Sequence, residues 1–297
     1  MAEARIQAKG ELFPAEVVSD MFTKVRGKSS IASLCGETPI PFNGMQTFTF
    51  SMDNEVNIVA ENGQKPAGGI TVEPVVIQPL KIEYGARISD EFLYASEEKQ
   101  LDILTQFTDG YSKKVARGLD IMSMHGVNPR DGLASALIGT NSFDTNTGVA
   151  KVTYAAGSEE SNLEDAIAAL GEYDNTGYAI SKKFGAALGK LKANGVRQFP
   201  EFALGGNPEA LNGIPCSVNS TVSFGTNKDE VILGDFAGAF KWGYAREIPM
   251  EIIQYGDPDG TGKDLKNYNQ VYLRAETYIG WGILLPAAFV RITGASE

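Results

Sequence analysis

The sequence predicts an α+β body that carries long extended segments. Three observations lead to this fold class. Side chains alternate between apolar and polar from Gln46 to Tyr84, apolar residues recur at helical spacing from Glu97 to His125, and the chain after Gly213 is rich in short strand-like runs. With 297 residues, 43% of them hydrophobic and 21% charged, the chain has the ordinary make-up of a protein that buries one or two cores.

Charge and cysteine content narrow the function classes. A formal net charge of −11 argues against a nucleic-acid-binding surface, because affinity for phosphate depends on clustered Lys and Arg. Cys35 and Cys216 are the only cysteines, which favours a reduced intracellular origin over a disulfide scaffold. The longest apolar run, Ile279 to Ile292, is shorter than the roughly 20 residues of a membrane span, and Met1 to Gly10 lacks the apolar core of a secretion signal.

The first part of the chain is predicted to be an extended arm with one docking element. Residues 1–43 mix charges, prolines and short apolar groups without a sustained period. Within them, Ser19 to Arg26 is the stretch that we expect to form a short helix.

A long two-stranded hairpin is the clearest element of the sequence. Apolar residues fill most even positions on both sides of a turn-rich tip, Glu61 to Gly69. Each half has about 15 residues, or roughly 50 Å at the usual strand rise, whereas typical strands have about 5–6 residues. The apolar face either folds back on its own domain or packs on another subunit. The residues expected at an inter-subunit contact are Phe48, Phe50, Met52, Val56, Ile58, Ile70 and Val72.

A long amphipathic helix is predicted next, from about Glu97 to His125. Its apolar residues are three or four positions apart and keep one face of the helix apolar, and Gly126 is a suitable terminator. Gly110 and Gly118 lie inside the helix, where each glycine lowers helix stability by about 1 kcal/mol relative to alanine. We therefore expect close backbone packing or a bend at those turns.

Helices and strands alternate in the rest of the chain. Ser161 and Glu164 form a capping-box pattern before a helix from Leu163 to Gly171, and a second helix is predicted from Lys183 to Asn194. The later strands are expected at Val231–Leu233, Phe240–Tyr244, Met250–Ile253, Val271–Glu276, Ile279–Leu285 and Phe289–Ile292.

No motif in the sequence supports catalysis, a cofactor or a metal site. The loop from Gly256 to Asp264 is similar to a phosphate loop and to a calcium loop, but its spacing is one residue too long for the first. For the second, Tyr268 stands where a closing Glu is needed. His125 is the only histidine. It lies at the predicted C-terminal end of the helix, where the helix dipole favours a positively charged side chain, so a structural role is expected.

Segments along the whole chain resemble one family. They are Leu12-Phe13-Pro14, Glu61 to Pro66 at the hairpin tip, Ala116 to Gly126 at the end of the long helix, Tyr178 to Phe199, Gly213-Ile214-Pro215, Leu233-Gly234-Asp235-Phe236, and Arg274 to Ile292 with Pro286-Ala287-Ala288-Phe289. In their order and spacing, these segments resemble the major capsid proteins of tailed bacteriophages, of the Hong Kong ninety-seven type.

The resemblance implies four structural parts. These are an N-terminal arm at 1–44, an extended E-loop at 45–85, a peripheral domain at 86–150 and 236–275 with its spine helix at about 97–125, and an axial domain at 151–235 and 276–297. It also implies the function of a major capsid (head) protein that assembles as pentamers and hexamers into an icosahedral shell around double-stranded DNA. The shell would form in the bacterial host cytoplasm. The protein would have no enzymatic activity and would bind no cofactor.

The partners implied are other copies of the chain, a portal, a cement protein and packaged DNA held without sequence-specific binding. Because some family members carry a scaffolding region ahead of the arm and only a short arm stands here, we expect either a separate scaffolding protein or a processed segment that this sequence lacks. Some family members join subunits by Lys–Asn cross-links, for which Lys65 at the tip is the nearest candidate; an exposed polar contact is the other interpretation. The alternatives are an encapsulin-type nanocompartment shell and a metal- or nucleotide-binding enzyme that uses the loop at 256–264.

Overall fold

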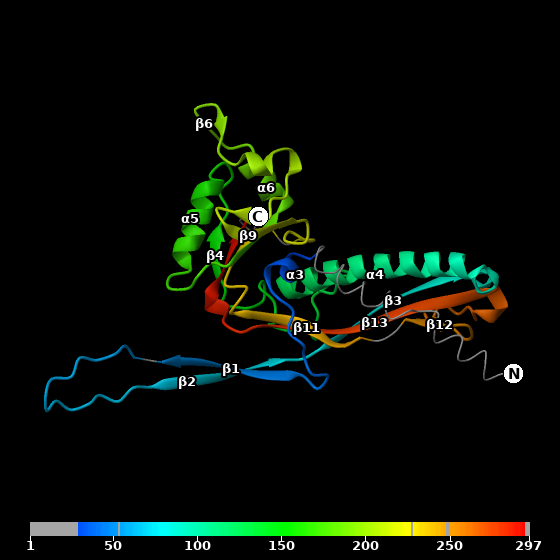
Figure 1. The fold of residues 1–297 in the computed structure, drawn as a ribbon, viewed down its shortest axis with the longest axis horizontal. Helices are drawn as coiled ribbons and strands as arrows, with labels where there is room; N and C mark the ends of the chain where they lie inside the picture. The colour runs from blue at the N-terminus through cyan, green and yellow to red at the C-terminus, as the bar shows by residue number, and fades with distance from the viewer. Residues whose placement is uncertain (1–28, 53, 227, 248–249, 295–297) are drawn as a thin grey trace.

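A computed structural model describes residues 29–52, 54–226, 228–247 and 250–294. The predicted helix at Ser19–Arg26 and the Leu12-Phe13-Pro14 segment lie outside these ranges. Within them the molecule is elongated: two sheets and a long helix form a body, and a two-stranded arm projects from it (Figure 1). In the described part of the chain, no helix has the length and apolar character needed to cross a membrane.

One sheet is built around a single long strand, β13 (Gln270–Ile283). It pairs with β3 (Leu80–Ser89) on one side and with β11 (Phe240–Glu247) and β12 (Glu251–Ile253) on the other, all antiparallel. Two separate strands, Val271–Glu276 and Ile279–Leu285, were predicted here. In the structure Glu276 forms an ion pair with Lys81 at 2.7 Å, and the Thr277 hydroxyl hydrogen-bonds that of Tyr111 at 2.8 Å, so both polar groups fit within one strand.

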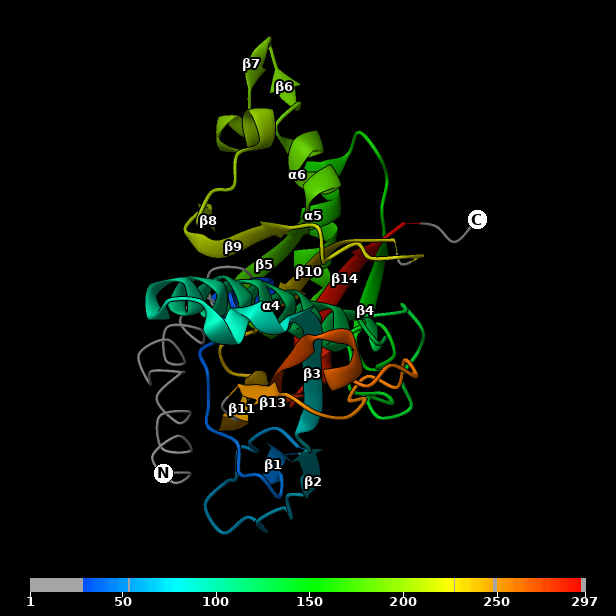
Figure 2. The same cartoon turned by 90° about the vertical axis from the view of Figure 1, so that its right-hand side faces the viewer.

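Helix α4 (Glu97–His125) lies across this sheet and has the predicted bounds (Figure 2). Leu104, Val115 and Leu119 are buried along its inner face, and Gly126 ends it with the left-handed φ of 68°. The two internal glycines differ. Gly118 is buried in ordinary contact with Pro129, whereas a Cβ at Gly110 would meet open space, and nothing in the structure explains a glycine there.

The second sheet has the order β4-β14-β10-β5-β9-β8. Side chains alternate between its faces: Val231 and Leu233 join a core with the helices on one side, while Ile232 joins the core that also contains α4. The strands are β4 (Ala150–Thr153), β5 (Gly177–Ser181), β8 (Ala210–Leu211), β9 (Ile214–Asn219), β10 (Asp229–Gly234) and β14 (Phe289–Thr293). The helices are α5 (Glu159–Ala169), α6 (Lys182–Leu188) and the short α3 (Ser30–Leu34).

Two helix boundaries in this region were predicted wrongly. Helix α5 begins at Glu159, not at a Ser161 capping box, and Glu159 accepts hydrogen bonds from Gly157 N (3.0 Å) and the Tyr154 hydroxyl (2.9 Å). Helix α6 ends at Leu188, and the chain then forms the hairpin β6 (Lys192–Ala193) and β7 (Val196–Arg197). Asn194 and Gly195 both have positive φ at its turn, which is the geometry that an Asn-Gly pair favours.

An aromatic cluster joins the two sheets into one body. The ring of Phe143 contacts Phe236, Phe240 and Phe289 at centroid distances of 5.0–6.0 Å, and all four side chains are fully buried. Because these rings come from both sheets and from the loop after α4, we expect the body to unfold as one unit. The remaining elements are the 3₁₀ turns at Asp90–Tyr94, Pro200–Gly205, Lys266–Tyr268 and Pro286–Ala288.

The division into an N-terminal arm, E-loop, peripheral domain and axial domain stays a prediction, and two of its boundaries fall inside strands of the structure. The boundary between 275 and 276 falls inside the continuous strand β13. The E-loop end at 85 falls inside β3, which belongs to the body sheet.

Candidate assembly surface

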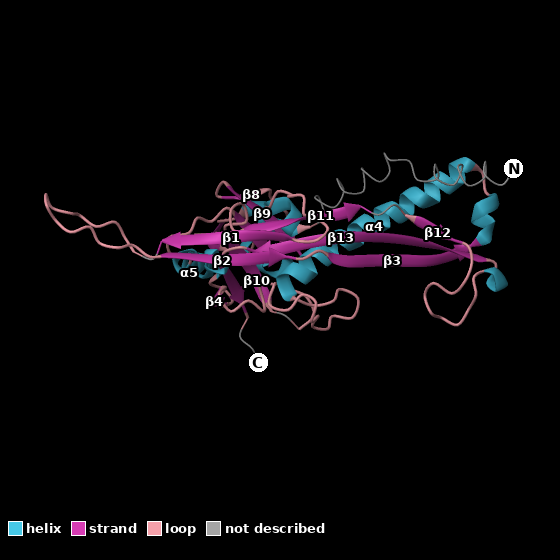
Figure 3. Ribbon diagram, turned by 90° about the horizontal axis from the view of Figure 1, so that it is seen from below, coloured by secondary structure: helices cyan, strands magenta, loops and turns pink. Residues whose placement is uncertain are grey.

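The arm consists of β1 (Met45–Met52) and β2 (Ile70–Ile77), paired antiparallel (Figure 3). Phe50 lies opposite Val72 and Met52 opposite Ile70. Directly opposed residues in an antiparallel pair present their side chains on the same face. One side of the arm is therefore apolar. We call it the arm face and define it by Phe48, Phe50, Met52, Ile70, Val72 and Val76.

The arm face is exposed within a single subunit. Its six side chains are each between 52% and 75% exposed. Isolated apolar side chains on a surface are ordinary, but a continuous apolar stripe of this kind marks a site of interaction. The alternative of folding back on the same domain is not what the structure adopts.

The paired part of the arm is shorter than the 46–84 hairpin that was predicted. Pairing stops at Met52 and Ile70, and residues 54–69 form no strand. Val56 and Ile58 lie in that segment and are 96% and 98% exposed, and Lys65 is exposed at the tip. At the other end the ladder stops at Ile77, Gln78 and Pro79 separate β2 from β3, and the later alternation belongs to β3.

The root of the arm is fixed to the body. Ile77 is fully buried against two glycines of β13, and a Cβ at Gly282 would lie 2.7 Å from the Ile77 side chain. Gly44, with φ of 88°, makes the turn that leads into β1. The arm is therefore anchored at its base while its apolar face remains uncovered.

A buried carboxylate, Asp120, holds three segments together where α3, α4 and β9 meet. Its oxygens accept hydrogen bonds from Ser30 N (2.9 Å), Ile31 N (3.1 Å) and the Ser29 hydroxyl at the start of α3. They also accept bonds from the Thr221 hydroxyl (2.7 Å) and the Asn219 amide (3.2 Å) after β9. Burial raises the pKa of Asp120, although each of these donors stabilises its carboxylate form.

A second buried group of charges lies at the end of α4. His125 Nδ1 is 2.9 Å from Asp144, and its Nε2 is 2.7 Å from the Thr221 carbonyl oxygen. Because both ring nitrogens face acceptors, this geometry favours the protonated imidazolium, in which both nitrogens donate. Burial alone would lower the pKa of His125, but the hydrogen bonds to Asp144 and Thr221 and the nearby negative charge together outweigh burial and raise the pKa. Arg291 Nη1 donates to Asp144 and to Asp229, the second bond at 2.8 Å.

This group fits a structural ion network better than a metal site. His125, Asp144 and Asp229 place one ligand atom each within 4.8 Å of one another. However, the Arg291 guanidinium donates to both carboxylates and already supplies the positive charge that a cation would bring. Sequence reasoning found His125 but missed its partners. The only signal for them was a charged residue inside an apolar run, such as Arg291 between Val290 and Ile292.

The same network predicts a pH dependence of stability. Burial and then the neighbouring Asp144 raise the pKa of Asp229 to about 7, so the folded protein holds this proton more tightly than the unfolded chain does. Stability is then lost as pH rises from about 4 to 7, and the raised pKa of His125 acts in the same direction. The lowered pKa of Asp144 acts oppositely, but only as pH falls below the usual aspartate range.

We therefore expect the free energy of unfolding of the subunit to fall by about 1–4 kcal/mol between pH 5 and 8. In Asp229→Asn this slope should be smaller, because the titrating group is gone. Urea unfolding followed by circular dichroism at several pH values measures both. Asp174→Asn, at an exposed position, is the control and should follow the wild type. Equal slopes in the wild type and Asp229→Asn would contradict the account.

The loop at 256–264 uses its carboxylates within the protein. Arg87 Nη2 donates to Asp257 at 2.6 Å, and Arg87 Nε donates to Asp259 at 2.8 Å. The hydrogen bond from Arg87 holds the pKa of Asp259 well below its usual range. A cation or nucleotide here would have to compete with this guanidinium, so the loop gives little support to the enzyme alternative.

Comparisons with known proteins agree with this geometry. A family model described as the phage capsid family matches residues 9–294. A solved structure from Mycobacterium phage Ogopogo has a TM-score of 0.77 at 28% identity, covering 90% of this chain and 92% of that one. One from Gordonia phage Cozz has a TM-score of 0.74 at 25% identity, covering 91% and 87%.

A further structure, titled as the capsid of an empty GTA particle, shares the fold at 16% identity with a TM-score of 0.63, covering 91% of this chain and 90% of that one. No curated protein matches the sequence. The match to the family model extends over nearly the whole chain and includes the arm, the long helix and both sheets. The chain is thus a structural subunit of a viral shell, and it belongs to the phage capsid family.

Proposed function

We propose that this major capsid protein is held in its shell chiefly by the arm face, which a neighbouring copy covers in each pentamer and hexamer. The observation that carries the proposal is an anchored arm whose six apolar side chains remain exposed in one subunit. In this arrangement the arm is the E-loop, and the covering surface is the long helix and peripheral region of the next copy.

The free energy gained by burying the arm face supports its role as the main contact between subunits. Aromatic side chains bury about 150–250 Å² each, so a ring that is 59–60% exposed, such as Phe48 or Phe50, leaves roughly 100 Å² to bury. At about 25 cal/mol per Å², each ring contributes about 2–3 kcal/mol on contact. Several such side chains per arm, repeated at every subunit, stabilise a closed shell although each single contact stays reversible.

The remaining parts of the proposal concern partners and place. The shell encloses double-stranded DNA, and a net charge of −11 disfavours non-specific adhesion to that polyanion. Assembly takes place in the bacterial cytoplasm with a separate scaffolding protein, a portal at one vertex and a cement protein on the outside. The family match favours this function over an encapsulin-type compartment with an enzyme cargo.

Assembly of the purified protein tests the proposal directly. The protein, alone or with its scaffolding protein, is concentrated and observed by size-exclusion chromatography with light scattering and by negative-stain microscopy. Closed shells of uniform diameter are expected. A well-folded monomer that never assembles under either condition would count against the proposal.

Lys65 at the arm tip is expected to make an exposed polar contact and not a covalent cross-link. Shells boiled in detergent should therefore run as single subunits on a denaturing gel, both for the wild type and for Lys65→Arg. A ladder of covalent oligomers that is present in the wild type and absent in Lys65→Arg would show that the cross-link forms.

A further inference from the structure

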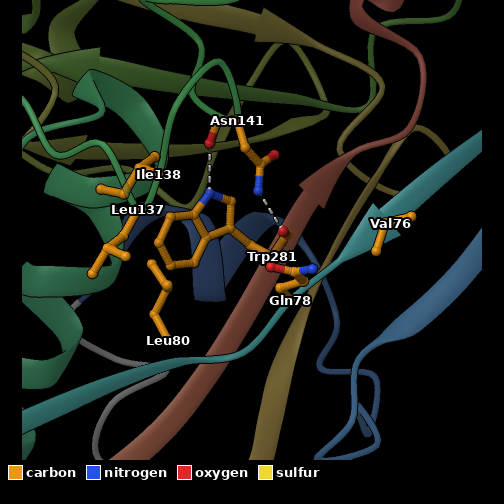
Figure 4. A pocket seen from close by; sticks show the side chains of 7 residues that line it. All are labelled: Val76, Gln78, Leu80, Leu137, Ile138, Asn141 and Trp281. Atoms are coloured by element: carbon orange, nitrogen blue, oxygen red, sulfur yellow. Dashed lines mark hydrogen bonds between the residues drawn. The ribbon is translucent and has the colours of Figure 1, made fainter.

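A pocket lies where the arm joins the body (Figure 4). Val76 of β2 and Leu80 at the start of β3 line it, together with Leu137 and Ile138 from the loop after α4 and Trp281 from β13. Gln78 and Asn141 add polar groups to this mainly apolar set of residues. Its volume is about 220 Å³. Pockets for drug-sized ligands measure about 300–1,000 Å³, whereas a cavity of about 150 Å³ holds a benzene ring. The pocket therefore has the size for one large apolar side chain.

The pocket is held open by its own hydrogen bonds. Trp281 Nε1 donates to the Asn141 carbonyl oxygen at 2.8 Å, and Asn141 Nδ2 donates to the Trp281 carbonyl oxygen at 2.7 Å (Figure 4). This reciprocal pair fixes the loop after α4 to β13 and keeps the indole in place. A preformed pocket binds more tightly than one that must first be ordered.

The pocket adjoins the arm face through one shared residue. Val76 belongs to both: it lies on the same face of the arm as Phe48 and Phe50, and it lines the pocket. At the rim, Leu137 is 82% exposed, so an apolar side chain lies uncovered beside the pocket. A partner that covers the arm face meets the pocket next.

We propose that the neighbouring copy that covers the arm face also inserts an apolar side chain into this pocket, so that arm and pocket together form one socket for a second copy of the chain. The proposal rests on the function proposed above. Interfaces draw most of their binding energy from a few side chains seated in such pockets, which makes this socket the anchor of the contact.

Thiol labelling at the rim tests the proposal. Cys35 and Cys216 are both buried, and burial raises the pKa of each thiol to about 11, so neither reacts readily with maleimide. Leu137→Cys then carries the reactive thiol. It should label rapidly in isolated subunits, at least tenfold more slowly in shells made of this chain alone, and rapidly again after the shells are dissociated.

Either of two results would overturn the proposal. Labelling in shells at the rate of free subunits would mean that no neighbour covers the pocket. Protection already present in isolated subunits would mean that another segment of the same chain fills it.

A charge placed at the rim gives an independent measurement. Leu137→Asp should raise the concentration needed for assembly at least tenfold, while the matched variant Leu133→Asp, in the same loop and 67% exposed but outside the pocket, should change it little. If the wild type assembles, Phe50→Asp does not, and Leu137→Asp behaves as Leu133→Asp does, the pocket proposal alone fails. Failure of the wild type to assemble would instead refute the proposed function.

Discussion

Subunits that carry Phe50→Asp are expected to fold normally and to form no shells. Phe50 is 59% exposed in the subunit, so the substitution removes no contact on which the body depends. In the shell, the change removes about 2–3 kcal/mol of apolar burial and adds the desolvation of a carboxylate without a partner, which costs several kcal/mol more. A loss of about 5–6 kcal/mol lowers the affinity of each contact roughly 10,000-fold, and every subunit of a shell carries the loss.

Two control variants make this result specific. Phe50→Leu keeps an apolar side chain and should still assemble. Thr47→Asp places the same charge on the opposite face of the arm and should assemble better than Phe50→Asp. Light scattering measures assembly, and circular dichroism confirms that the body is folded. Normal particles from Phe50→Asp would refute the role of the arm face.

Asp120→Ala is expected to have the largest effect on the stability of the subunit itself. The carboxylate is fully buried and accepts hydrogen bonds from α3 and from the segment after β9. Its removal leaves several donors buried without an acceptor, at about 1–3 kcal/mol each. We expect the free energy of unfolding to fall by about 3–6 kcal/mol, similar to the effect of removing one partner of a buried ion pair.

Urea unfolding followed by circular dichroism measures the Asp120 effect. Asp120→Asn keeps the shape of the side chain but turns one acceptor into a donor, so its stability should lie between those of Ala and the wild type. Asp102→Ala, at an exposed position of the same helix, is the matched control and should change stability by less than about 0.5 kcal/mol. A loss below about 1 kcal/mol in Asp120→Ala would show that the junction does not depend on this residue.

The sequence predictions were most accurate where the signal for an element lies within the element's own residues. Helix α4 was predicted with its observed bounds, because a long apolar stripe and the terminator Gly126 both lie within one segment. The break in the arm at Pro79 and the hairpin at Asn194-Gly195 also had local signals, but a longer periodic pattern was given priority over them. The continuity of β13 also depends on a contact distant in sequence, since the buried hydroxyl of Thr277 accepts a hydrogen bond from Tyr111 of α4.

One part of the candidate assembly surface was predictable from the sequence, and the other was not. Alternation alone identified the arm face, because β pairing keeps alternate residues on one side. The pocket was not predictable, since Val76, Leu137 and Trp281 come from three distant segments that only the folded chain brings together. The contact residues Phe48, Phe50, Met52, Val56, Ile58, Ile70 and Val72 stay a prediction, because the surface that would cover them belongs to another copy.

A cryo-electron microscopy map of shells assembled from this protein tests the central claim most directly. The account predicts that the side chains of the arm face, exposed in the single subunit, lie buried against an adjacent copy of the chain in every pentamer and hexamer. A map in which the arm folds back on its own body, or in which Phe48, Phe50 and Val72 face solvent, would contradict it.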